Sequence, residues 1–329
     1  MRSYLLLIGA VIASEVEESS SACRGRKLGH YTWSTKLWKQ GSRDLLDFFI
    51  SPDGQEWGCG DLTINVGDSS AKRSIYSKDS IVPFIQAYRK ETLNYESVIW
   101  LSYGDTVTHN GSNTDIFIDK FFDWIETITE DDANTLGQIG LSLDVEYMPA
   151  HFTEQSLIKA VARRDAVTNF PAGKLLINHV VDMELNPAST DAIMRLADSA
   201  SFMLYRNYLM SSEFPEELNM LNRAKFFLTE QCERCLDDDH VAANYKAKVT
   251  FMVEASCGPL SFCAEKSFCA PEGGATYMWS TLMQLEEMML SSGLITRSQF
   301  AHLFNPTTRY AVHDWKCMFY STTCILNYL

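Results

Sequence analysis

The sequence has no excess of basic residues, because 28 lysines and arginines stand against 42 aspartates and glutamates, a formal net charge of -14. Nucleic acids and anionic membranes bind through basic patches, so this balance argues against both as partners. No apolar run after the first 13 residues is long enough to cross a bilayer, so we expect no membrane span. The sequence also lacks low-complexity linkers and internal repeats, which favours one domain over residues 23–329.

The N-terminal residues have the pattern of a secretory signal. Arg2 supplies a positive start, Tyr4–Ala13 is a short apolar run, and small residues follow at Ser19–Ala22. We expect a signal peptide over residues 1–22, with cleavage after Ala13 or after Ala22. The chain should then be secreted, or held in the lumen of an endomembrane compartment.

Nine cysteines fit disulfides in such an oxidising compartment. The cysteines are Cys23, Cys59, Cys232, Cys235, Cys257, Cys263, Cys269, Cys317 and Cys324. The spacing of Cys232 and Cys235, followed by His240, is also compatible with zinc or a redox pair, although structural disulfides are favoured. Three cysteines between residues 257 and 269 predict a disulfide-stapled loop. An odd number leaves at least one thiol free or paired with another chain, and Asn110-Gly111-Ser112 is a glycosylation acceptor.

The run Gly140-Leu141-Ser142-Leu143-Asp144-Val145-Glu146-Tyr147 alternates with a period of two. One face is apolar and suits packing under helices, whereas the other ends in two carboxylates about 7 Å apart at Cα. In a (β/α)8 barrel, catalytic residues collect at that end of the strands. The alternative is an edge strand with its acids in water, or part of a metal-binding loop.

Apolar strand-like runs alternate with helical stretches from residue 30 onward. The expected strands are 30–37, 62–67, 97–103, 139–147, 174–181, 201–208, 249–255 and 275–280. Residues 224–229 compete with 249–255 for the seventh strand. A helix over 153–167 is expected with Thr153 at its N-cap. Eight strands, each followed by a helix or a long crossover, predict a single-domain α/β fold, the TIM (β/α)8 barrel.

Six short motifs, each on its own predicted strand, resemble the family 18 glycoside hydrolases, the chitinase and endo-β-N-acetylglucosaminidase group. The motifs are Gly29-His30-Tyr31-Thr32, Leu62-Thr63-Ile64-Asn65-Val66, Leu101-Ser102-Tyr103-Gly104, Asp144-Val145-Glu146-Tyr147, Met203-Leu204-Tyr205 and Met278-Trp279-Ser280. The chain also departs from the family pattern. The first two acids of the family signature fall on Ile139 and Ser142, Arg206 stands in place of the usual acid after the tyrosine, and Met278 directly precedes Trp279.

The resemblance implies a mechanism in which the 2-acetamido group of the sugar is the nucleophile. Glu146 would be the acid and base, Asp144 would orient the acetamide, and Tyr205 would hydrogen-bond its carbonyl. Residues expected to bind substrate are Trp279, Tyr31, Trp33, Ser102 and Met203. Substrates would be oligosaccharides or polysaccharides containing N-acetylglucosamine, with neither metal nor cofactor, and the lost acids predict slow turnover.

Other interpretations stay open at this stage. Buried Tyr205 and Trp279 are also compatible with ordinary core residues, and Asp68 and Asp182 with loop-capping acids. Glu254, at the end of the seventh strand, could pair with Glu146 as in two-carboxylate retaining glycosidases. A non-catalytic glycan-binding protein is the third hypothesis, favoured by serine at position 142. The oligomeric state is not predicted.

Overall fold

The computed structural model describes residues 27–39, 41–68, 74–104, 111–145, 148–204, 219–255, 268 and 274–313. The strands are β1 Leu28–Thr32, β2 Leu62–Asp68, β3 Val98–Gly104, β4 Gln138–Asp144, β5 Leu175–Val181, β6 Ser199–Met203, β7 Lys248–Glu254 and β8 Tyr310–His313. The helices are α1 Asp44–Ile50, α2 Pro52–Trp57, α3 Lys78–Thr92, α4 Gly111–Ile125, α5 Glu130–Leu136, α6 Ala150–Ala166, α7 Pro187–Leu196, α8 Met220–Phe226, α9 Asp238–Asn244, α10 Gly274–Ser291 and α11 Arg297–Leu303, with short 3-10 and π segments at Thr35–Leu37 and Phe227–Gln231.

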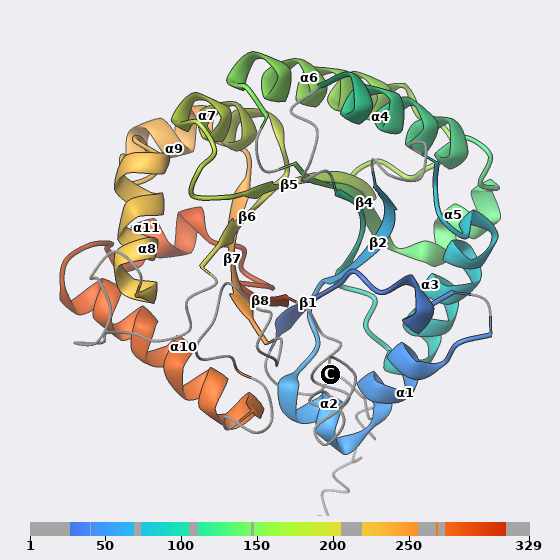
Figure 1. Ribbon diagram of the computed structural model, residues 1–329, viewed down its shortest axis with the longest axis horizontal. Coiled ribbons are helices and arrows are strands. Elements are labelled where there is room, and N and C mark those ends of the chain that lie inside the picture. The colour runs from blue at the N-terminus through green and yellow to red at the C-terminus, as the bar shows by residue number, and fades with distance from the viewer. Residues whose placement is uncertain are drawn as a thin grey trace, which may run out of the picture.

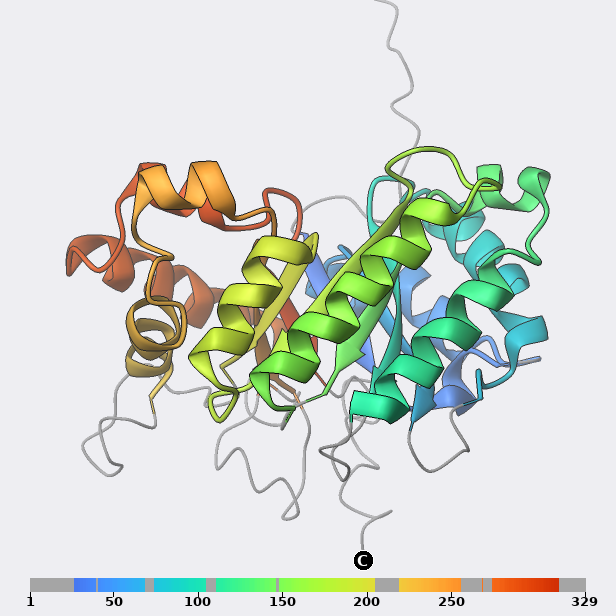
Figure 2. The same ribbon diagram turned by 90° about the horizontal axis from the view of Figure 1, so that it is seen from above.

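The strands form a closed parallel barrel in sequence order, and β8 closes it by pairing with both β7 and β1. The helices surround this ring (Figure 1), and the longer ones lie along its outside (Figure 2). The predicted single-domain (β/α)8 barrel is confirmed. The carboxyl ends of the strands therefore meet at one face, where Figure 1 looks onto the barrel.

The alternation predicted for β4 is present in the structure. Leu141, Leu143 and Val145 belong to the core between barrel and helices, whereas Ser142 and Asp144 face the barrel interior. Neighbouring strands repeat this division because side chains alternate across a strand. The outer row binds the helices, and the inner row can carry polar groups toward the mouth of the barrel.

The amphipathic helix α4 shows how the outer layer is held. Its buried residues Phe117, Phe121 and Ile125 recur at helical spacing, and the Phe117 ring stacks on Tyr103 of β3 at 4.4 Å. A Cβ at Gly67 of β2 would come within 2.4 Å of the Phe117 ring. Glycine at this position therefore lets the helix approach the sheet.

The prediction of a strand over residues 275–280 is wrong, because this segment belongs to α10. Met278, Leu282, Leu285 and Met289 are all buried at spacings of three or four residues, which is the period of a helix. The true last strand is β8, which is only four residues long. A short apolar run allowed either structure, and the longer helical period decided it.

Two smaller predictions also differ from the structure. Strand β1 ends at Thr32, and Thr35–Leu37 form a 3-10 turn instead of continuing it. Helix α6 begins at Ala150 after Pro149, so Thr153 lies inside the helix and not at its N-cap. The Thr153 hydroxyl is buried and bonds within the protein, including to Ser189 at 3.3 Å.

Cys232 and Cys235 form a disulfide, which agrees with a disulfide and not with zinc ligation at this pair. Cys59 is also disulfide-bonded. The predicted signal peptide, the glycosylation acceptor and the proposed loop with Cys257, Cys263 and Cys269 lie outside the described residues. No helix in the described ranges is long and apolar enough to cross a membrane.

Trp100 of β3 lies inside the barrel, on the amino-terminal side of the polar residues, and its indole donates to Asp61 at 3.2 Å. Gly140 on β4 leaves room for this ring, since a Cβ there would lie 2.4 Å from it and 2.8 Å from the carbonyl oxygen of Leu176. Gly140 is thus a packing position in the inner row of β4, and it precedes the polar residues Ser142 and Asp144 of that row.

We predict that Gly140→Ala lowers the free energy of unfolding by about 1–3 kcal/mol, because a methyl group would overpack the barrel interior. Urea unfolding measures this effect. In a Trp100→Leu background the same substitution should cost less, since the ring it strikes has been removed. An equal cost in both backgrounds would contradict this packing account.

Candidate functional site

Asp144 is the last residue of β4 and faces the barrel interior at its carboxyl end. Its side chain is buried, with 2% exposed. Burial penalises the charged form and raises the pKa of Asp144 to about 6, and the nearby Asp182 acts in the same direction. A positive charge on His313, when this residue is protonated, and a hydrogen bond from Tyr31 lower this pKa and partly offset the effect of burial. The carboxyl group is therefore poised to titrate near neutral pH.

The Tyr31 hydroxyl of β1 holds one oxygen of this carboxyl group. It donates to Asp144 Oδ2 at 3.0 Å and lies 2.5 Å from Ser102 Oγ on β3. A phenol has one proton to donate, so Ser102 must be the donor to Tyr31. The second oxygen, Asp144 Oδ1, is buried without a hydrogen-bond partner among the described residues. A buried unpaired carboxylate oxygen is costly, because it has lost its hydrogen bonds to water without gaining others.

A second, uncharged chain of hydrogen bonds lies beside the first. Asn178 of β5 donates to Ser142 Oγ at 2.8 Å, and Ser201 of β6 donates to Asn178 Oδ1 at 3.1 Å. Ser142 pairs in register with Ser102 on one side and Asn178 on the other. Ser142, at a position where the family pattern described above has an acid, thus belongs to a neutral hydrogen-bond network spanning β4 to β6.

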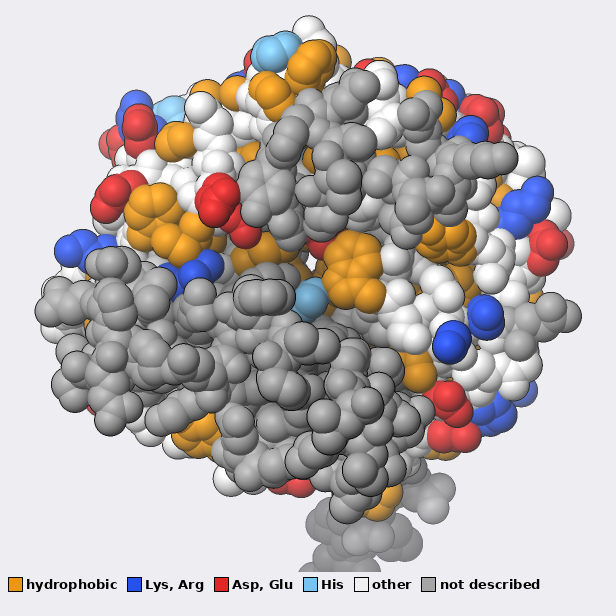
Figure 3. All heavy atoms as spheres, viewed as in Figure 1, with side chains coloured by type: hydrophobic (Ala, Val, Ile, Leu, Met, Phe, Trp, Pro, Cys, Tyr) orange, Lys and Arg blue, Asp and Glu red, His pale blue; other side chains and the backbone are white. Residues whose placement is uncertain are grey.

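The mouth of the barrel has an aromatic side next to β1. Trp33 is half-buried and donates its indole N–H to His313 Nε2 at 2.8 Å. Its ring and the His313 ring both contact Tyr31, with centroids 5.3 Å apart in each case. Figure 3 shows a histidine and a large hydrophobic side chain near the centre of this face.

Apolar side chains complete the interior around Tyr31. Val180, Met203 and Met252 pack with Tyr31 in one buried cluster, and Trp33 lies against it. These residues come from β5, β6, β7 and the end of β1, so the cluster bridges the barrel. It gives the carboxyl group an apolar environment, which is the physical cause of its raised pKa.

The structure brings together five of the predicted site residues: Asp144, Tyr31, Trp33, Ser102 and Met203. Glu146 and Tyr205 lie outside the described residues, so their placement stays a prediction.

Trp279 does not lie at the end of a barrel strand. It is in α10, within the core outside the barrel, where its indole donates to the carbonyl oxygen of Trp57 at 3.2 Å. Its predicted strand position was wrong because the segment is helical. Asp182 accepts from the backbone N–H of Glu184 at 2.7 Å, which fits the loop-capping interpretation. The side chain of Asp68 is not described.

Sequence reasoning missed His313 and Asn178. His313 was missed because the last strand was placed too early. The run Tyr310-Ala311-Val312-His313 alternates and follows a turn at Asn305-Pro306, and this signal could have found it. Glu254 was considered only as a nucleophile, whereas the structure shows it 3.1 Å from His313 Nδ1.

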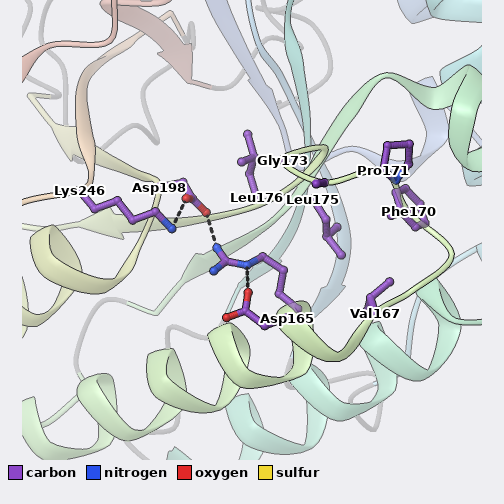
Figure 4. A pocket seen from close by; sticks show the side chains of 11 residues that line it. Asp165, Val167, Phe170, Pro171, Gly173, Leu175, Leu176, Asp198 and Lys246 are labelled. Carbon is purple, nitrogen blue, oxygen red and sulfur yellow. Dashed lines mark hydrogen bonds and ion pairs between the residues drawn. The ribbon is translucent and has the colours of Figure 1, made fainter.

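A separate pocket of about 580 Å³ lies at the opposite ends of the strands (Figure 4). Asp198 bonds there to Arg164 at 2.9 Å and to Lys246 at 2.6 Å, and Arg164 also bonds to Asp165. The two positive and two negative charges pair with one another. This arrangement ties the starts of β6 and β7 to α6, and we assign it to stability.

No protein-family model matches the chain, and no curated protein matches it. Solved structures with similar folds include a GH18 chitinase from Pseudoalteromonas aurantia, with a TM-score of 0.43 and 8% identity over 88% of this chain and 93% of that chain. A class V chitinase from Nicotiana tobaccum has a TM-score of 0.41 and 12% identity over 70% of this chain and 67% of that chain.

Tryptophan synthase subunit alpha from Legionella pneumophila has a TM-score of 0.38 and 12% identity, over 86% of this chain and 94% of that chain. The chain is a (β/α)8 barrel with a buried carboxyl group and aromatic rings at the carboxyl end of its strands.

We predict that Asp144→Asn stabilises the protein at pH 7.5 by on the order of 2 kcal/mol. The folded-state pKa of Asp144, about 6, lies above its usual value of 3.8. Folding therefore disfavours the ionised form, and wild-type stability falls as pH rises between these two values. Asparagine carries no charge and still accepts from Tyr31. Urea unfolding at pH 7.5 and pH 4 should show the gain at the higher pH and little at the lower.

The matched control for this prediction is Asp131→Asn, which changes an exposed acid in α5. It should leave the pH dependence of stability as in the wild type. Parallel pH profiles for wild type and Asp144→Asn would contradict the buried-carboxylate account.

Proposed function

We propose that this chain is a secreted glycoside hydrolase that acts on glycans containing N-acetylglucosamine, by substrate-assisted retaining catalysis. The observation that carries the proposal is the unpaired oxygen Asp144 Oδ1, buried at the mouth of the barrel. This oxygen lacks a hydrogen-bond donor, and the N–H of a 2-acetamido group would supply one. A glucoside without the acetamide would offer a hydroxyl instead and no internal nucleophile.

In the proposed first step, the carbonyl oxygen of the 2-acetamido group attacks C1 of the sugar. The bond from C1 to the glycosidic oxygen breaks, and Glu146 gives its proton to that oxygen. The cyclic oxazolinium ion that forms is positively charged, and ionised Asp144 stabilises it through Oδ1. In the second step water attacks C1, the ring opens, and Glu146 takes a proton from the water.

The Tyr31 hydroxyl has a defined part in this scheme. Because it donates to Asp144 Oδ2, it holds the carboxylate in one orientation and leaves Oδ1 toward the ligand. It also lowers the pKa of Asp144, which increases the ionised fraction that the cation needs. The resemblance of the sequence to family 18 supplies Tyr205 as the donor to the acetamide carbonyl.

Aromatic and apolar side chains would bind the sugar ring. Trp279 cannot serve as the floor of the site from its place in α10. Trp33 is half-buried, lies against Tyr31, and is the described tryptophan next to the Tyr31–Asp144 pair. We assign the stacking role to Trp33, with Met203 and Met252 beneath it.

Two alternatives have observations in their favour. Glu254 is 4% exposed at the end of β7 and could act as the nucleophile of a two-carboxylate mechanism. Ser142 is neutral and accepts a hydrogen bond from Asn178, which favours slow turnover or a glycan-binding protein without activity. Two experiments distinguish these alternatives: replacement of Glu146, and comparison of substrates with and without the N-acetyl group.

The first prediction concerns Glu146→Gln, which is nearly isosteric but cannot donate a proton in the same way. It should lower turnover of N-acetylglucosamine oligomers by at least about two orders of magnitude while oligomer binding persists. A reducing-end assay and calorimetry measure the two effects. Near-normal turnover of Glu146→Gln would refute the acid–base role. A wild-type protein that binds the oligomers without turning them over would favour the glycan-binding protein without activity.

The second prediction concerns the nucleophile. A thiazoline analogue of the cyclic intermediate should inhibit, since it resembles the charge-developed state. Oligomers without the N-acetyl group should not react. Under the two-carboxylate alternative, plain glucosides would react and a fluorosugar would label Glu254. Finding that label by peptide mass mapping would overturn substrate assistance.

A further inference from the structure

We infer that Glu254 and His313 form a positioning relay that holds Trp33 at the mouth of the barrel as a platform for a sugar ring. The assignment of the sugar rests on the proposed function, whereas the relay itself rests on hydrogen bonds and packing among described residues. It makes Glu254 a positioning residue and gives glycan binding a dependence on the protonation state of His313.

The hydrogen atoms of the relay can be assigned from its donors and acceptors. The indole N–H of Trp33 can only donate, so His313 Nε2 must accept and carries no proton. The remaining proton of a neutral imidazole then lies on Nδ1, which donates to Glu254 Oε2 at 3.1 Å. The order of the relay is therefore Trp33 to His313 to Glu254, running from the end of β1 across β8 to β7.

Neighbouring residues restrict the position of the Trp33 ring. A Cβ at Gly104 would lie 2.2 Å from Trp33 Cη2, so the indole occupies the space above this glycine. Gly104 pairs in register with Asp144, which places the ring next to the carboxyl group. Tyr31 contacts the indole from within the barrel. Fixing an aromatic ring before the ligand arrives reduces the entropy lost on binding.

The relay needs a neutral His313. Protonation would place a hydrogen on Nε2 and remove the acceptor of the Trp33 bond. Among the described residues, the titratable groups that face His313 are Glu254 of β7, Tyr31 of β1 and Asp144 of β4. Lowering the pH should release Trp33 and weaken glycan binding, even though the ion pair between protonated His313 and Glu254 would gain strength.

The test uses the full chain and begins without any ligand. The ¹H–¹⁵N resonance of the Trp33 indole, assigned with Trp33→Phe, reports the bond to His313. Glu254→Leu removes the acceptor at the end of the relay, Glu254→Gln keeps an uncharged acceptor, and His313→Phe keeps a ring without nitrogen. Glu287→Gln is the control, because Glu287 is exposed on α10.

Glu254→Leu and His313→Phe should shift or broaden the Trp33 resonance and weaken binding of an N-acetylglucosamine tetramer about tenfold. KM should rise more than kcat falls. Glu254→Gln and Glu287→Gln should keep the resonance and the affinity close to wild type. Acidification of the wild type should move the resonance as His313→Phe does.

An unchanged Trp33 resonance in both Glu254→Leu and His313→Phe would overturn the relay. Loss of turnover in Glu254→Gln with the resonance in place would also overturn it, because Glu254 would then act in the chemistry. If the resonance responds as expected but the wild type binds no tetramer, the relay stands and the proposed function fails.

Discussion

Everything in the candidate site depends on one desolvated carboxyl group held at one of its two oxygens. Asp144 is buried at the end of β4, Tyr31 donates to Oδ2, and Oδ1 has no partner among the described residues. Burial alone would favour the neutral acid, and the phenol acts against burial. The balance leaves a carboxyl group with a pKa of about 6 and with one oxygen that has no hydrogen-bond partner among the described residues.

The barrel makes this arrangement possible because it separates stability from chemistry. The outer rows of the strands are apolar and bind the helices, while the inner rows carry Ser102, Ser142, Asn178 and Asp144. The charge network of Arg164, Asp198 and Lys246 lies at the opposite ends of the strands. A costly polar site at one end is thus supported by a core and a surface network that do not take part in it.

Local periodicity and the resemblance to known motifs together predicted the part of the site that lies on regular strands. The alternation of β4 identified Asp144 and its direction, and the motifs on β1, β3 and β6 placed Tyr31, Ser102 and Met203 at the same site. The last strand was missed, because the short run at 275–280 was taken for it and because β8, although it alternates, is only four residues long. Trp279 was misplaced and His313 overlooked for this one reason.

Contacts between distant residues were outside the reach of sequence patterns. The bond from Tyr31 to Asp144 joins positions 113 residues apart, and the bond from Trp33 to His313 joins positions 280 residues apart. Motif matching named some of these residues but not their partners. The structure was needed to propose Trp33 in place of Trp279 as the stacking residue. It was also needed to infer the role of Glu254 beside His313.

The most direct test of the central claim is a crystal structure of Glu146→Gln with an N-acetylglucosamine tetramer bound. The account predicts an acetamide nitrogen within hydrogen-bonding distance of Asp144 Oδ1, about 2.7–3.2 Å, with the sugar ring against Trp33. A tetramer bound with its acetamide turned away from Asp144, or bound elsewhere on the barrel, would contradict it.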